Sequence, residues 1–85
     1  MKKKHILVTL KIVCGEYEFS SKHLATLNLR RNEWRYALSY AKDFYGACTS
    51  TSDDTFYFNG GEIAVSVRGV AQVSAADAEV LARFI

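Results

Sequence analysis

The side chains that could perform chemistry are few and widely separated in this sequence. Two histidines (His5, His23) and two cysteines (Cys14, Cys48) are its bases, thiols and soft metal ligands. Neither histidine has a cysteine or carboxylate at a spacing that indicates a catalytic dyad, and the Cys and His spacings match no zinc motif. The aspartates at 53–54 could bind a cation, but such a pair in a Ser/Thr-rich loop usually begins a turn. We therefore expect no catalytic residues, no metal and no cofactor.

A second group of side chains could bind a partner, and it lies on one predicted helix. The segment NEWRYALSYAKDFYG (32–46) has the apolar period of a helix that Asn32 can cap and Gly46 can end. The predicted buried stripe of this helix is Trp34, Ala37, Leu38, Ala41 and Tyr45. Tyr36, Tyr40 and Phe44 form an aromatic ridge at i, i+4 and i+8 along it. The ridge either covers the sheet edge and the 47–54 loop, or it is a protein-binding hot spot, since Tyr, Trp and Arg dominate such sites.

Basic residues in and before the same helix offer nucleic acid as an alternative partner. If the helix begins early, Arg31, Arg35 and Lys42 align along one flank. That flank lies about 160° from the aromatic ridge on a helical wheel, whereas base-stacking sites need rings and cations in one groove. The predicted contacts to a protein partner are Arg31, Arg35, Tyr36 and Tyr40. The alternative contacts, to RNA or single-stranded nucleic acid, are Arg30, Arg31, Arg35 and Lys42.

Length and composition limit the class of protein. Eighty-five residues form one domain (1–85), and a hydrophobic content of 49% is typical of a folded globule. The net charge of +2 does not require nucleic acid and argues against an acidic mimic of DNA. No apolar run approaches the ~20 residues of a membrane span. Two cysteines make no disulfide framework, so cytoplasm is the expected location.

Alternating apolar residues predict strands before and after the helix. In HILVTLKIVC (5–14) the even-numbered residues, Cys14 included, take the buried face. A tight turn at Gly15 and Glu16 leads into a second strand, which gives Tyr17 and Phe19 the buried parity. After an irregularity at Ser20 and Ser21, this strand is expected to continue through HLATLNL.

A second hairpin follows the polar loop. The run around Phe56 and Phe58 is joined to an alternating run over 62–73 by Asn-Gly-Gly at 59–61, which favours a reversal with positive φ rather than a phosphate loop. In the second run the odd-numbered residues, Gly69 included, have the buried parity.

The last segment, SAADAEVLARFI (74–85), predicts a second helix. Ser74 and Asp77 resemble a capping box, and Glu79 can pair with the arginine four residues later. The predicted packing face is Val80, Leu81, Phe84 and Ile85. The predicted fold is thus a two-layer α+β domain of order ββαββα, with an antiparallel sheet of about four strands, two helices on one of its faces, and an open second face.

In size and style the chain resembles the small inhibitors that phages and mobile elements encode against host defence complexes, of which anti-CRISPR proteins are the best-known group. The resemblance rests on the architecture and on the Tyr- and Arg-rich segment RRNEWRYALSYAKDFYG (30–46). It implies a stoichiometric inhibitor that acts in the host cytoplasm by occluding a protein or ribonucleoprotein surface, without a cofactor. A homodimeric, self-associating subunit is a further alternative.

Overall fold

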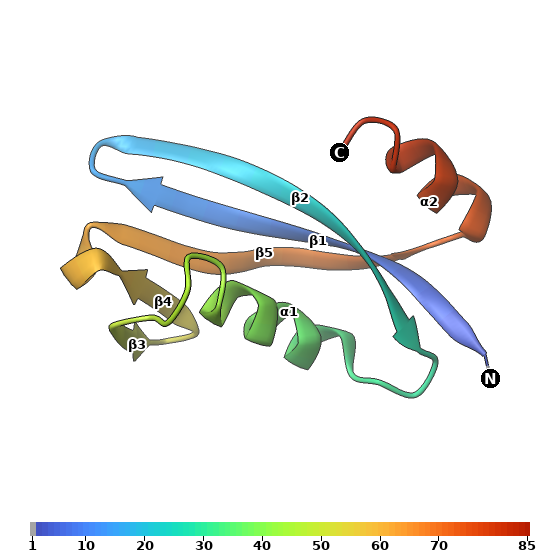
Figure 1. The fold of residues 1–85 in the computed structure, drawn as a ribbon, viewed down its shortest axis with the longest axis horizontal. Helices are drawn as coiled ribbons and strands as arrows, with labels where there is room; N and C mark the ends of the chain where they lie inside the picture. Colours follow the sequence, from blue (N-terminus) through green and yellow to red (C-terminus); the bar gives the residue numbers. More distant parts are fainter. Residues whose placement is uncertain (1) are drawn as a thin grey trace.

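The computed structural model describes residues 2–85, which form one antiparallel sheet of five strands and two helices (Figure 1). In chain order the elements are β1 (Lys3–Cys14), β2 (Tyr17–Asn28), α1 (Glu33–Lys42), β3 (Ser50–Ser52), β4 (Thr55–Phe58), β5 (Ile63–Val73) and α2 (Ala75–Leu81). The strands lie side by side in the order β2-β1-β5-β4-β3. The predicted α+β class is confirmed. The sheet has one strand more than expected, because part of the polar 47–54 loop pairs with β4.

The β1–β2 hairpin contains the two longest strands of the sheet. Its two strands pair over their whole length from Cys14↔Tyr17 to Lys3↔Asn28, which confirms that the second strand continues through HLATLNL. The expected irregularity at Ser20 and Ser21 is wrong, because both residues pair with β1 in an unbroken register. A two-residue turn joins them, and Gly15 adopts the positive φ of +62° that such a turn needs. The core lies on the face that carries the even-numbered residues of β1, which are fully buried: Ile6, Val8, Leu10 and Ile12.

The ends of β1 and β2 next to this turn are less covered than predicted. Cys14 is exposed, and Tyr17 and Phe19 are 78% and 48% exposed, so their predicted burial is wrong. All three side chains lie on the core face, as their pairing with β1 requires. A residue on the core face of a strand is buried only where another layer covers that face. Helix α1, which covers the core face, ends short of this turn (Figure 1).

A bulge in β5 changes which of its residues face the core. Thr9 pairs with Gly69 but Leu10 pairs with Val67, so Arg68 is an extra residue. Beyond the bulge the parity is inverted, and Val70 packs against the core. The prediction that Gly69, Ala71 and Val73 face the core is therefore wrong. Their partners in β1 are odd-numbered residues, which lie on the opposite face of the sheet.

The two hairpin turns at the far side of the sheet form as their sequences indicate. At 53–54 the two aspartates have φ of +49° and +61° and connect β3 to β4, which is a turn geometry. At Asn59–Gly61 a short 3₁₀ turn connects β4 to β5, and both glycines have positive φ. The predicted β4–β5 hairpin is confirmed.

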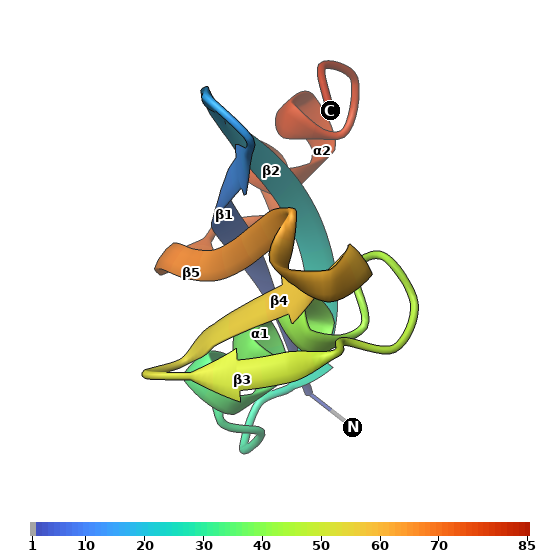
Figure 2. The ribbon, with the colours of Figure 1, turned by 90° about the vertical axis from the view of Figure 1, so that its left-hand side faces the viewer.

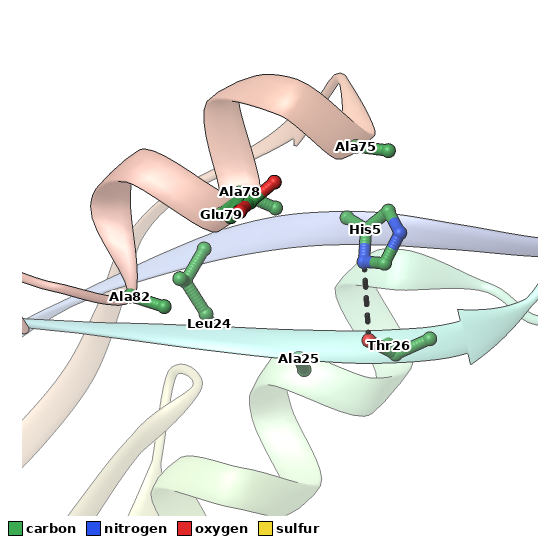
Figure 3. Close-up of a pocket in the computed structure, with 8 residues that line it drawn as sticks. All are labelled: His5, Leu24, Ala25, Thr26, Ala75, Ala78, Glu79 and Ala82. Carbon is green, nitrogen blue, oxygen red and sulfur yellow. Dashed lines mark hydrogen bonds between the residues drawn. The ribbon is translucent and has the colours of Figure 1, made fainter.

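The two helices lie on opposite faces of the sheet, which corrects the prediction that both cover one face. Helix α1 packs on β5 and β1 over the core face. Helix α2 covers the other face, beside His5, Leu24 and Thr26, which point away from α1. In Figures 2 and 3 the strands β1 and β2 separate the two helices.

Small residues hold α2 against the sheet. Ala78 is buried, and Ala75 and Ala82 line the same space between helix and strands (Figure 3). The predicted packing face is wrong for Val80, Phe84 and Ile85, which are exposed. The alanine side of α2 faces the strands, so Val80 and the residues after the helix remain at the surface, whereas Leu81 is half-buried. The cap at Ser74, which accepts a hydrogen bond from the backbone N–H of Asp77 at 3.0 Å, is confirmed, as is the pairing of Glu79 with Arg83 at 3.8 Å.

Candidate binding site on helix α1

Helix α1 is shorter than predicted and is rotated toward its tyrosines. Asn32 caps it as expected, by accepting a hydrogen bond from the backbone N–H of Arg35 at 2.8 Å, but the helix ends at Lys42, before Gly46. Ala37 and Ala41 are fully buried against the sheet. Trp34 and Tyr45, which were predicted to extend this buried stripe, are 44% and 48% exposed. Tyr45 lies beyond the helix end, where the helical period no longer applies.

The aromatic ridge of α1 is half-buried and packs against the core. The ring centroids of Tyr36 and Tyr40 are 6.2 Å apart, and those of Tyr40 and Phe44 are 5.9 Å apart. His23, on the core face of β2, lies under them, with its ring 4.9 Å from that of Tyr40 and 5.3 Å from that of Phe44. These contacts fix the rings and leave one side of each accessible. The rings thus cover β2 at the sheet edge, as the first interpretation expects, and they keep a partly exposed surface.

A hollow of about 360 Å³ opens on this surface. We call it the α1 hollow; its walls are Arg31, Tyr36, Ser39, Tyr40, Asp43 and Phe44. The guanidinium carbon of Arg31 lies 5.1 Å from the centroid of the Tyr36 ring, within the range of a cation–π contact. The predicted separation of cations from the ridge is therefore wrong for Arg31. This residue precedes the helix, so its side chain can fold back over the ring in a way that a helical wheel does not allow.

A short chain of hydrogen bonds supports the floor of the hollow. The hydroxyl of Tyr40 lies 3.2 Å from Nδ1 of His23, and Nε2 of His23 lies 2.7 Å from the hydroxyl of Ser21. This connectivity resembles a nucleophile, a base and an orienting group, but the third member is a neutral phenol, which cannot stabilise an imidazolium as a carboxylate does. Burial lowers the pKa of His23 from its ordinary value of 6.5, which favours the neutral ring. The arrangement positions Tyr40 rather than activating Ser21.

Positive charge gathers beside the hollow, where the start of β1 meets the segment before α1. The Nζ of Lys4 donates a hydrogen bond of 2.7 Å to the carbonyl oxygen of Arg31 and lies 3.5 Å from a carboxylate oxygen of Glu33. The backbone N–H of Leu29 donates to the carbonyl oxygen of Lys2 at 3.2 Å. Five of the eleven Lys and Arg residues lie in these two segments, here called the basic end: Lys2, Lys3, Lys4, Arg30 and Arg31.

The structure brings together only part of each predicted contact set. Arg31, Tyr36 and Tyr40 meet in the α1 hollow, whereas Arg35 is exposed in the first turn of α1 and does not line it. Of the alternative set, Arg30 lines a separate depression with Lys2, Asn28 and Leu29 at the basic end. Lys42 is in the last turn of α1, away from the basic end. The predicted flank of Arg31, Arg35 and Lys42 does not form, because Arg31 is outside the helix.

Sequence reasoning missed His23 and Ser21 as members of this site. Both occupy odd-numbered positions of β2, which face the core when Cys14 pairs with Tyr17. Extending that register along β2 would have placed His23 opposite the buried Val8 and so on the face that α1 covers.

The remaining side chains that could perform chemistry lie apart from the α1 hollow. Cys14 and Cys48 are both free thiols, and the sulfur of Cys48 is 3.7 Å from the hydroxyl of Thr51. Nδ1 of His5 bonds the hydroxyl of Thr26 at 3.1 Å. Within residues 2–85 no group of three or more His, Cys, Asp or Glu side chains is placed to hold a metal ion. No helix in the same part of the chain has the length and apolar character to cross a membrane.

Comparison of the sequence with protein-family models and with curated proteins, and of the structure with solved structures, gave no significant match.

Proposed function

We propose that this protein is a non-enzymatic binding domain that docks on a partner protein through the α1 hollow. The observation that carries the proposal is the joining of an arginine and three aromatic rings in one hollow whose rings are already fixed by the core. Tyr and Arg are the side chains that most often dominate binding energy at interfaces. Rings held before binding lose little conformational entropy when a partner covers them. Arg31, Tyr36 and Tyr40 are the proposed contacts, and Arg35 contacts the partner outside the hollow.

The class of partner comes from the resemblance to anti-CRISPR proteins. On that basis the partner is a protein or ribonucleoprotein complex of host defence, and the domain inhibits it in the cytoplasm by covering a functional surface, one inhibitor for each site. Mutual electrostatic attraction contributes to this docking, because the basic end flanks the hollow and ribonucleoproteins carry exposed phosphates.

The test is affinity capture from a host lysate, carried out with and without nuclease. The double variant Tyr36→Ala/Tyr40→Ala should lose the captured protein. Trp34→Ala is the matched control, because Trp34 is an exposed aromatic residue of the same helix that does not line the hollow. Circular dichroism must first show that each variant is folded. Equal capture by the double variant and by the wild type would remove the two tyrosines from the proposed site.

A single-stranded nucleic acid is the second candidate partner, and one observation favours it. Arg31 stacks on Tyr36 beside the basic end, and this combination of cation and ring suits a base and its phosphate. Arg30, Arg31 and Arg35 would contact the phosphates, and Lys42 would extend that contact along α1. Binding of a labelled single-stranded oligonucleotide should then weaken steeply with added salt. Arg31→Ala should weaken it more than Lys42→Ala, and oligonucleotide binding that neither substitution changes would count against this candidate.

A further inference from the structure

The outer edge of β2 is the longest unpaired feature of the sheet. This strand has twelve residues, Tyr17–Asn28, and β1 is its only neighbour in the part of the chain that the structure describes. An open edge of this length exposes a row of backbone donors and acceptors that can pair with another strand. Short edge strands are a common protection, and β3, at the opposite edge, has only three residues. Strand β2 lacks that protection.

Only half of this edge is free. Ala82 and Ile85, which follow α2, line a hollow with His23 and Leu24, so the C-terminal residues lie beside the second half of β2. In Figure 1 the half next to the β1–β2 turn has no element along its outer side, whereas α2 and the C-terminus lie beside the other half. The free portion therefore runs from Tyr17 to about His23, and its centre is Ser20.

We propose that two copies of this protein pair through this free half of β2, antiparallel and centred on Ser20. Each β2 residue then lies opposite the residue that is equally far from Ser20 in the partner copy. Glu18 lies opposite Lys22 of the partner copy, and Lys22 opposite its Glu18, so opposite charges face each other twice. Moving the centre by two residues would set Glu18 against Glu18, or Lys22 against Lys22. Like charges directly opposite are unfavourable, so charge disfavours those two registers, whereas centring on Ser20 joins each Glu18 to a Lys22.

The same register covers the exposed aromatic residues of the hairpin. On the core face Tyr17 lies opposite His23 of the partner copy, and the two Phe19 side chains are diagonal neighbours, a distance that aromatic rings span. These are the side chains that remain exposed in a single copy, Tyr17 at 78% and Phe19 at 48%. Among residues 2–85, Lys22 has no ion-pair partner within its own chain, whereas Glu18 pairs with Lys11 at 2.9 Å. Pairing of the copies therefore gives Lys22 its carboxylate.

Antiparallel pairing at an edge keeps equivalent faces on the same side. Both copies of α1 would lie over one face of a continuous ten-stranded sheet, and both α1 hollows would open on that side. The dimer brings Tyr17 beside His23, which lies beneath the α1 hollow, but it covers none of the residues that form the walls of the hollow. It is therefore compatible with the proposed function and does not depend on it.

Charge reversal tests the dimer. In Lys22→Glu, two glutamates face each other at both contacts, and in Glu18→Lys, two lysines do so. Sedimentation over a range of protein concentrations should show self-association of the wild type, and each single variant should associate at least about tenfold more weakly. An equimolar mixture of the two variants should recover the dimer, because each mixed contact again joins a lysine to a glutamate. A misfolded variant could not give this recovery.

A cross-link provides a second measurement. In a Cys14→Ser/Cys48→Ser background, Ser20→Cys should form an intermolecular disulfide on mild oxidation, since equivalent Ser20 residues face each other at the centre. Thr26→Cys, in the half of β2 beside the C-terminal helix, is the control and should not. A wild type that stays monomeric at every concentration would overturn the proposal. So would a dimer that neither charge reversal weakens, or equal cross-linking at both positions.

Discussion

Tyr40→Phe tests whether the hydrogen bond under the α1 hollow stabilises the fold. The substitution removes the hydroxyl that lies 3.2 Å from Nδ1 of His23 and keeps the ring in place. Both residues are half-buried, so water replaces the lost partner only in part. A net hydrogen bond of this kind contributes about 0.5–1.5 kcal/mol, and we expect a loss of about 1 kcal/mol in the free energy of unfolding. For a domain of this length that corresponds to a fall in Tm of about 4–8 °C.

The matched control is Tyr36→Phe. Tyr36 belongs to the same helix and the same hollow, is also half-buried, and its hydroxyl forms no hydrogen bond within residues 2–85. Its stability should therefore stay within about 0.5 kcal/mol of the wild type. Urea unfolding followed by circular dichroism at neutral pH measures both changes, with a constant m-value as the sign that the unfolding transition is unaltered. Equal losses in the two variants, or no loss in Tyr40→Phe, would show that the Tyr40–His23 contact does not hold the hollow in place.

Three further predictions concern stability. Burial lowers the pKa of His23 below 6.5, so the unfolded chain binds a proton at this residue more readily than the folded protein does. The contribution of neutral His23 to the free energy of unfolding should therefore be complete above pH 6.5 and be lost as the pH falls through the lower folded-state pKa. In urea unfolding, His23→Gln should flatten this part of the pH profile. Asn32→Ala removes the cap of α1 and should cost about 1 kcal/mol, whereas Asn32→Asp, which keeps the acceptor oxygen, should cost much less; equal costs in thermal unfolding would contradict the capping role. Asp53→Asn combined with Asp54→Gly should raise stability by about 0.5–1 kcal/mol, because Asn-Gly prefers the positive φ of both turn positions; an unchanged or lower Tm would refute this reading of the turn.

Much of the fold could be predicted because its signals lie within a few residues of one another. The Asn-Gly-Gly turn at 59–61, the cap at Asn32 and the cap at Ser74 each depend on local hydrogen bonds and φ preferences. The bulge at Arg68 has no such signal, since it arises from pairing with β1 and reverses the parity of all that follows in β5. The side of the sheet that α2 covers was also beyond local reasoning. Its apolar residues fit either face, and in the structure its alanines, rather than the predicted larger residues, face the strands.

The candidate site could be predicted only for the residues that share a helix. Tyr36 and Tyr40 follow from the helical period. Phe44 lies beyond the helix end at Lys42, and it joins them through ring contacts with Tyr40 and His23. Arg31 joins them because a non-helical segment folds back over Tyr36, and His23 joins them because β2 pairs with β1 in one particular register. Both contacts depend on tertiary structure, which a helical wheel does not contain.

The most direct test of the central claim is to locate the bound partner on the surface. A photoreactive amino acid placed at Ser39, an exposed wall of the α1 hollow, should cross-link a host protein in nuclease-treated lysate. The same group placed at Ala76, exposed on α2 at the opposite face of the sheet, is the control. We predict a cross-linked product of higher mass at Ser39 that is absent at Ala76. A product at Ala76 and none at Ser39 would contradict the claim that the α1 hollow is where this protein binds.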